Sequence, residues 1–172
     1  MMFKRADTAI LGKIPYMFAN LNLKDVIQFM EKEHFLLLLP LGSTEPHGPH
    51  CPLSTDISIS SEACLRAAQT LHSRNCEAYV LPPMSYSIAK SAEHFSGCIS
   101  ISKEMDSYLI SDVALSLINQ GIEKICIFNS HFDPWHISAI YDAMDMVNLK
   151  TGMNLLFTDI TKKIFGTAHS SV

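Results

Sequence analysis

Short, uninterrupted apolar runs alternate along the chain with longer segments whose apolar residues recur at helical spacing. The clearest run, "FLLLL", covers residues 35–39 and stops at Pro40 and Gly42. Such a run predicts a strand that is buried on both faces, as in a parallel sheet with helices on either side. Residues 23–34 have apolar positions at near-helical spacing behind Asn22, a residue suited to cap a helix, and predict an amphipathic helix.

The same two patterns continue to the end of the chain. Further helices are expected over residues 57–75, 103–120 (ended by Gly121) and 135–151 (ended by Gly152). Strands are expected at "EAYVLPP" (77–83), "KICIFN" (124–129) and "NLLFTDI" (154–160), with a short half-exposed strand near residues 99–101. In the helix over 103–120, one apolar face is expected to pack on the core: Met105, Leu109, Val113, Leu117 and Ile118.

Strands that alternate with helices predict an α/β fold with a mainly parallel sheet. No internal repeat, low-complexity segment or linker divides the sequence, so we expect residues 1–172 to form one domain. In sheets of this kind, ligands bind outside the carboxyl ends of the strands. Functional residues are therefore expected in the loops that follow the buried strands.

Two of these loops carry side chains that bind metals. "LPLGSTEPHGPHCPLSTD" places Glu45, His47 and Asp56 after the first strand, and "NSHFDP" places His131 and Asp133 after a later one. Carboxylate oxygens and imidazole nitrogens suit zinc, manganese or iron, and no cysteine shares this spacing to form a thiolate site. Five such groups, with carboxylates able to bridge, could hold two ions in the arrangement that activates water for hydrolysis.

Each of these residues also has a simpler interpretation, because a loop His or Asp commonly forms a turn or faces solvent. Two such clusters after two separate buried strands argue against coincidence. His50 is assigned to the turn, since the other three groups account for its loop, and Trp135 is assigned to the core. Glu93 and His94, in "SAEHFSG", fit either the lining of a site or a turn.

Composition and charge exclude several classes of partner. Hydrophobic residues make up 48% of the chain and charged residues 17%, as in a globular protein. The net charge is -4, the pI is near 6.0, and the 13 basic residues form no run. These values indicate no nucleic-acid or membrane partner, so we expect a small-molecule one.

The cysteines and the apolar stretches indicate the compartment. The five cysteines are odd in number and lack CxxC pairing, so reduced thiols are expected rather than disulfides or a zinc ribbon. No signal-peptide core is recognised at the N-terminus, and no stretch approaches the ~20 apolar residues that span a bilayer. A cytoplasmic protein is expected.

The first loop resembles the signature of the creatininase (creatinine amidohydrolase) family. In that signature a proline-glycine-serine run leads into Glu-x-His and Gly-Pro-His, and an Asp stands nine residues after the first His, as Asp56 does after His47. The similarity continues through "LPPMSYSIAKSAEHFSGCISIS" and "IFNSHFDP", the latter at the position of the family's Asn-Gly-His. The resemblance covers nearly the whole chain.

The resemblance implies a three-layer α/β/α fold and hydrolysis of a C–N bond in a small cyclic or formyl amide. It also implies two divalent ions, zinc or manganese or iron, and a homo-oligomer, often a hexamer. Asp56 becomes the ligand that bridges both ions. Glu45 and His131 are assigned to one ion, and His47 and Asp133 to the other.

The chain also departs from the family pattern. Ser130 stands in place of a glycine, Pro134 in place of an asparagine, and Asp133 is one methylene shorter than the creatininase glutamate. The family's later His-Ala-Gly and Glu-Thr-Ser segment is matched only by "FGTAHSSV", in which His169 takes the place of the histidine.

These departures lead to two expectations. His169, or Glu93 with His94, is predicted to protonate the leaving nitrogen of the substrate. The chain is then either an amidohydrolase with a compact C-terminus, or a truncated, catalytically impaired metal-binding member that acts in assembly or ligand binding.

Overall fold

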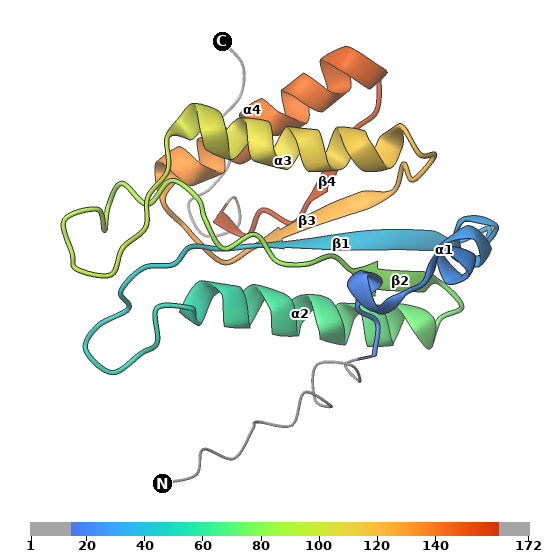
Figure 1. Ribbon diagram of the computed structural model, residues 1–172, viewed down its shortest axis with the longest axis horizontal. Helices are drawn as coiled ribbons and strands as arrows, with labels where there is room; N and C mark the ends of the chain where they lie inside the picture. The colour runs from blue at the N-terminus through green and yellow to red at the C-terminus, as the bar shows by residue number, and fades with distance from the viewer. Residues whose placement is uncertain (1–14, 162–172) are drawn as a thin grey trace, which may run out of the picture.

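The computed structural model describes residues 15–161, which form a four-stranded parallel sheet with helices on both faces (Figure 1). In chain order the elements are η1 (Phe18–Asn20), α1 (Leu23–Met30), β1 (Phe35–Leu41), α2 (Thr55–His72), β2 (Glu77–Val80), α3 (Lys103–Ile118), β3 (Ile125–Asn129), α4 (Pro134–Thr151) and β4 (Leu156–Phe157).

The sheet has the strand order β2-β1-β3-β4, and every neighbouring pair is parallel. Helices α3 and α4 lie together on one face of the sheet, and α2 covers the other face (Figure 1). The predicted three-layer α/β/α architecture is confirmed. None of the helices within residues 15–161 combines the length and the apolar composition needed to cross a membrane.

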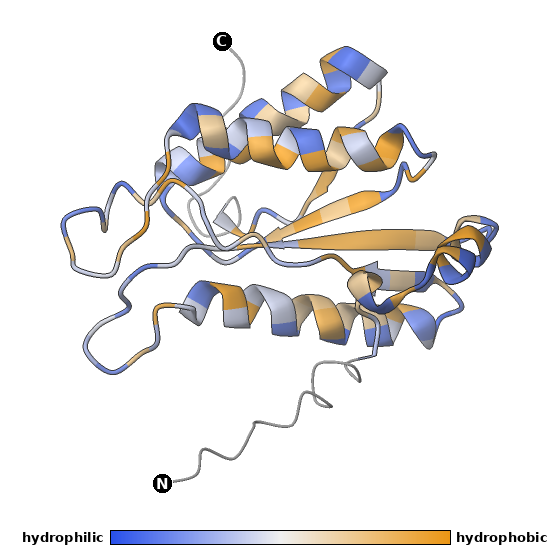
Figure 2. Cartoon of the chain, in the orientation of Figure 1, coloured by the Kyte–Doolittle hydropathy of each residue, from blue (hydrophilic) through white to orange (hydrophobic). Residues whose placement is uncertain are grey.

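The central strand β1 is buried on both faces, as its uninterrupted apolar run predicts. Leu37, Leu39 and Leu41 belong to the core beneath α3 and α4. Leu38, which points the other way, packs with Cys64 and Ala68 of α2. Figure 2 shows the result, with β1 and β3 hydrophobic along their length and the loops at their carboxyl ends far more polar.

The carboxyl ends of β1 and β3 lie side by side, because Leu41 pairs with Asn129. The chain leaves this edge of the sheet in the segments 42–54 and 130–133, and the loop over 81–102 extends beside them (Figure 1). Isolated bridges from Leu41 to Met84 and from Thr44 to Ile99 attach that loop to the end of β1. The loops that carry the predicted metal ligands therefore meet at one edge of the sheet.

Several elements differ from the sequence-based expectation. α1 ends at Met30, four residues before the predicted end, and the expected strand near 99–101 is reduced to isolated bridges at Ile99 and Ser100. That segment follows an irregular loop, so no neighbouring strand continues its pairing. Trp135, expected in the core, is 54% exposed.

The buried face of α3 matches the prediction only in part, because Leu117 and Ile118 are buried as expected but the first half of the helix differs. Met105 and Leu109 are 59% and 41% exposed, whereas Asp106 is 2% exposed. The helix buries an aspartate and two serines together with four apolar residues, and α4 packs against α3. The apolar spacing mispredicted the start of α3 because Asp106 is buried there. Its carboxylate is hydrogen-bonded to His136 of α4 and stands where an apolar residue was expected.

Gly42 allows α2 to begin close to the end of β1. A Cβ atom at this position would lie 2.7 Å from Ile57 Cδ1 and 2.9 Å from Asp56 Cβ. Both distances are shorter than side-chain contacts allow, and Asp56 belongs to the first turn of α2. The lack of a side chain at Gly42 thus sets how near Asp56 comes to the sheet.

We expect Gly42→Ala to lower the free energy of unfolding by about 1–3 kcal/mol, because the added methyl group overpacks the contact with α2. The measurement is urea unfolding followed by circular dichroism. Ser54→Ala is the control, since the Ser54 side chain caps nothing at the start of α2; it should change the stability by less than about 0.5 kcal/mol. Equal stabilities for both variants would contradict the close approach.

Candidate metal centre

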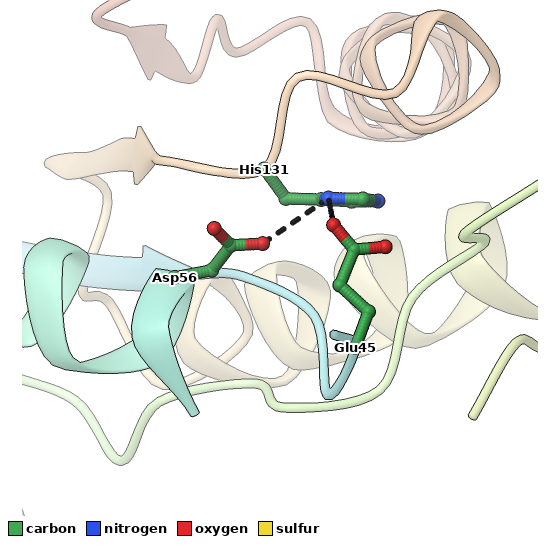
Figure 3. Close-up of side chains that lie close together, drawn as sticks. All are labelled: Glu45, Asp56 and His131. Carbon is green, nitrogen blue, oxygen red and sulfur yellow. Dashed lines mark ion pairs between the residues drawn. The ribbon is translucent and has the colours of Figure 1, made fainter. Parts of the chain in front are cut away.

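Three ligand-type side chains from three separate segments converge at the carboxyl edge of the sheet (Figure 3). Glu45 lies in the loop after β1, Asp56 in the first turn of α2, and His131 in the loop after β3. One ligand atom from each lies within 4.8 Å of the others, a spacing that fits a shared metal ion. Asp56 and His131 are buried, and Glu45 is half-buried.

The carboxylate of Asp56 lies between two imidazole rings. Its Oδ2 is 3.2 Å from His131 Nδ1, and its Oδ1 is 2.9 Å from His47 Nε2. Glu45 Oε1 is 3.2 Å from His131 Nδ1 and 3.9 Å from His47 Nε2. Each oxygen of Asp56 therefore faces a different histidine, which is the geometry that a bridging ligand requires.

Both imidazole rings are oriented by backbone carbonyl groups. His131 Nε2 donates to the carbonyl oxygen of Ile88 at 3.0 Å, and His47 Nδ1 donates to that of Glu45 at 3.1 Å. A carbonyl only accepts hydrogen bonds, so the nitrogen that faces it carries the proton. The other nitrogen of each ring, which faces Asp56, is then the one with a lone pair for a metal.

The chemistry of this group fits a divalent cation. When both rings are neutral, with their protons on the nitrogens that face the carbonyls, no group within residues 15–161 donates a hydrogen bond to the fully buried Asp56 Oδ2. A buried carboxylate oxygen without a donor is costly unless a cation satisfies it. Carboxylates and imidazoles together suit zinc or manganese.

Two pKa shifts reflect the crowding of charges in this group. Burial by itself disfavours the charged ring of His131, but the close contact with Asp56 and the charge of Glu45 outweigh it and raise the pKa. Burial also raises the pKa of Glu45, and the attraction of His131 offsets this only in part. Both shifts favour the protonated forms of these two groups, so a metal that binds here must compete with protons.

Asp133 lies at the same cavity but is held by backbone groups. Its Oδ1 accepts from the Trp135 N–H at 2.9 Å, which caps α4, and its Oδ2 accepts from the Ser91 N–H at 2.8 Å. Burial alone would raise the pKa of Asp133, but these two hydrogen bonds outweigh it and lower the pKa. Asp133 is thus ionised and faces the site without joining the three-residue cluster of Glu45, Asp56 and His131.

Ser130, one of the departures from the family pattern, has a local role. Its hydroxyl group donates to the backbone carbonyl of Asp56 at 2.5 Å. This bond joins the loop after β3 to the first turn of α2, the two segments that supply His131 and Asp56. Pro134 likewise begins α4, a position at which proline is well suited.

The cavity in front of these residues has a volume of about 430 Å³. Its lining consists of Glu45, Pro46, His47, Asp56, Ser91, Ala92, Phe95, Ser130, His131, Phe132 and Asp133. The phenyl groups of Phe95 and Phe132 are largely exposed and supply the apolar part of the wall. All five predicted ligands come from the two sequence motifs, and all five line this cavity.

Of the predicted proton donors, the two within the described residues, Glu93 and His94, are not brought to the ligands. Glu93 pairs with Lys90 at 2.8 Å, and the side chain of His94 is 86% exposed. Neither lines the cavity, although Ala92 and Phe95 on either side of them do. His169 lies outside the described residues, and His50 is exposed on its loop as expected.

Sequence reasoning missed the backbone groups that orient the site. The carbonyl group of Ile88 and the N–H group of Ser91 position His131 and Asp133, but any residue could supply them. The cavity residue Phe132 stands inside the recognised motif, between two predicted ligands, and that position was the available signal.

Two curated proteins are similar to this chain in sequence. A mycofactocin precursor peptide peptidase of Mycobacterium ulcerans (strain Agy99) is 40% identical over 99 residues, which cover 55% of this chain and 39% of that protein. The creatinine amidohydrolase of Pseudomonas putida is 24% identical over 103 residues, covering 57% and 38%. The chain thus spans about two fifths of the length of these curated relatives.

The fold has a solved counterpart as well. A structure described as "Creatininase Mn" superposes with a TM-score of 0.71 at 17% sequence identity, covering 91% of this chain and 66% of that one. The sequence model of the creatininase family, described as creatinine amidohydrolase, matches residues 19–170. Because this match extends over most of its length, the chain belongs to the creatininase family.

Proposed function

We propose that this chain is a metal-dependent amidohydrolase that binds two divalent ions, zinc or manganese, and hydrolyses an amide C–N bond. The observation that carries the proposal is the position of Asp56. Each of its oxygens faces an imidazole nitrogen whose ring partner is bonded to a backbone carbonyl. This arrangement presents two histidine lone pairs on either side of one carboxylate.

The proposed ligand sets follow from these contacts and from the family resemblance. Asp56 would serve both ions, Glu45 and His131 would hold one of them, and His47 and Asp133 would hold the other. When bound, two such cations lower the pKa of water and polarise a carbonyl group, the chemistry that amide hydrolysis needs. The ionised Asp133 suits this role, because its lowered pKa keeps it a carboxylate over the working pH range.

The residues around the ligands would bind and orient the substrate. Phe95 and Phe132 offer apolar surface to the part of the substrate next to the scissile amide. The leaving nitrogen must receive a proton, and the candidates are His169, Glu93 and His94. Glu93 would have to leave Lys90 to reach the cavity, since its carboxylate is bonded to that amine at 2.8 Å.

The proposed substrate class is a small cyclic or formyl amide. The peptidase relative at 40% identity favours a second candidate, an amide bond within a peptide. Both are hydrolysed at a C–N bond, so the same ligands serve either one. The proposed reaction is thus hydrolysis of an amide C–N bond, whether the substrate is a small amide or a peptide.

The bridging role of Asp56 can be tested by metal content. We expect about two ions per wild-type chain, almost none in Asp56→Ala, and about one in His131→Ala, because a bridging carboxylate serves both ions. The metal is measured by inductively coupled plasma mass spectrometry after gel filtration. His50→Ala, which removes an exposed histidine from the same loop, should retain the wild-type content. Full occupancy in Asp56→Ala would refute the assignment.

The raised pKa of His131 predicts a pH-dependent affinity. The raised pKa favours the doubly protonated ring in the metal-free site, and an incoming cation must displace the proton on Nδ1. Zinc binding should therefore release protons, and its affinity should rise with pH by up to ~tenfold per unit for each proton displaced, until the metal-free ring is neutral, which the raised pKa moves to higher pH. Calorimetry in buffers of different ionisation enthalpy measures the protons released. An affinity that stays constant between pH 6 and 8 would contradict the shift.

Turnover separates the two functions considered from the sequence. With zinc or manganese bound, we expect hydrolysis of at least one member of a panel of cyclic amides, formamides, lactams and short peptides, followed by mass spectrometry. His47→Ala should lower kcat strongly, and His50→Ala should not. Full metal content without turnover of any amide would instead favour a catalytically impaired, metal-binding protein.

Each candidate donor can then be replaced in turn. On the best substrate found, His169→Ala is expected to lower kcat more than Glu93→Gln or His94→Ala, with metal content as the control. Wild-type rates in all three variants would mean that the proton comes from water or from another group.

A further inference from the structure

Behind the candidate metal centre lies a second, fully buried acid-histidine pair. Asp106, in the first turn of α3, and His136, in the first turn of α4, are 2% and 1% exposed. Asp106 Oδ2 lies 2.6 Å from His136 Nδ1, which donates to it in a short, charge-assisted hydrogen bond. Neither residue lines the cavity, and neither is among the proposed ligands.

The second ring nitrogen of His136, Nε2, points toward the end of β3, next to the loop that carries His131. His136 Nε2 lies 3.2 Å from Asn129 Oδ1, at the end of β3. The amide of Asn129 is itself fixed, because its Oδ1 accepts from the His131 N–H at 3.0 Å and its Nδ2 donates to the His131 carbonyl at 2.6 Å. A flipped amide would lose both bonds, so Oδ1 is an acceptor and His136 Nε2 must donate to it.

The carboxylate of Asp106 reaches the same histidine by a second route. Its Oδ2 accepts from the Ile88 N–H at 3.0 Å, and the carbonyl of that same residue accepts from His131 Nε2 at 3.0 Å. The bonds thus close a circle through Asp106, Ile88, His131, Asn129 and His136. The rings of His131 and His136 also lie against each other, with centroids 5.2 Å apart.

We propose that Asp106 and His136 are positioning residues that hold His131 with its proton on Nε2 and its Nδ1 turned toward Glu45 and Asp56. Asp106 holds the N–H of Ile88, and the carbonyl of that residue accepts the hydrogen bond from His131 Nε2. His136, through Asn129, fixes the backbone on which the His131 side chain is mounted. The pair therefore selects both the orientation and the tautomer of a candidate ligand from a distance.

A purely structural role for the pair would look different in experiment. Two helices joined by a buried ion pair lose stability when it is broken, whatever happens at the edge of the sheet. A positioning role also changes the ligand itself, because without the Ile88 carbonyl in place His131 can carry its proton on either nitrogen. Partners that orient a ligating histidine are typically worth about 10- to 100-fold in metal affinity.

The first test measures zinc affinity by competition with a fluorescent chelator, and it rests on the proposed metal binding. Asp106→Asn and His136→Ala should each weaken zinc binding by about 10- to 100-fold. His136→Asn should lose less, because its amide can still donate to Asp106 in place of Nδ1. His72→Gln is the matched control, since His72 is a partly buried histidine bonded to the backbone of Ala78 on β2.

The stabilities of all variants are compared by thermal unfolding. If His72→Gln and Asp106→Asn are destabilised alike but only Asp106→Asn loses zinc affinity, the positioning role is supported. Wild-type affinity in folded Asp106→Asn and His136→Asn would overturn it. So would a loss of affinity that merely follows the loss of stability in all variants, His72→Gln included.

A second measurement needs neither a variant nor a metal. In ¹⁵N-histidine NMR spectra of the metal-free wild type, at a pH high enough to leave the ring neutral, His131 should show a protonated Nε2 and an unprotonated Nδ1. An Nδ1–H tautomer would overturn the inference. Absence of zinc binding by the wild type would refute the proposed function alone, because the tautomer would still be decided by this spectrum.

Discussion

The buried carboxylate of Asp56 constrains the structure at the carboxyl edge of the sheet, where the candidate metal centre lies. A carboxylate that is withdrawn from water must be matched by donors or cations, and here it begins α2, where the partial positive charge of the helix N-terminus favours it. The surrounding segments are shaped to admit it. Gly42 leaves room for it at the end of β1, and the Ser130 hydroxyl holds its backbone from the other side.

The architecture was accessible from sequence where burial is uniform or strictly periodic. β1 could be predicted because both of its faces are covered, and the end of α4 could be predicted because Gly152 adopts a left-handed conformation there. The buried residues in the first half of α3 could not be predicted, although Leu117 and Ile118 in its second half were. Hydrophobicity is an unreliable guide where a helix buries a charged residue such as Asp106 against a histidine partner that lies 30 residues away.

The candidate site was also predictable only in part. Side chains with metal-binding chemistry, such as Glu45, His47 and His131, stand in recognisable loops after buried strands. What turns them toward one another is backbone, and the sequence carries no residue type that announces a carbonyl at the right place. The burial of His136 could have been predicted from helical spacing. It lies three, four and seven residues before Ala139, Ile140 and Ala143, which are buried on the same face of α4.

Ile88 shows what this means for variation among related chains. Both its N–H and its carbonyl are engaged, while its side chain fills a buried space with 7% exposure. Proline is excluded at this position because it has no N–H to give to Asp106, but other apolar residues of similar volume meet every requirement. Related chains can therefore carry different apolar residues at this position and keep the same geometry. A position that is essential to the site need not have a characteristic residue type.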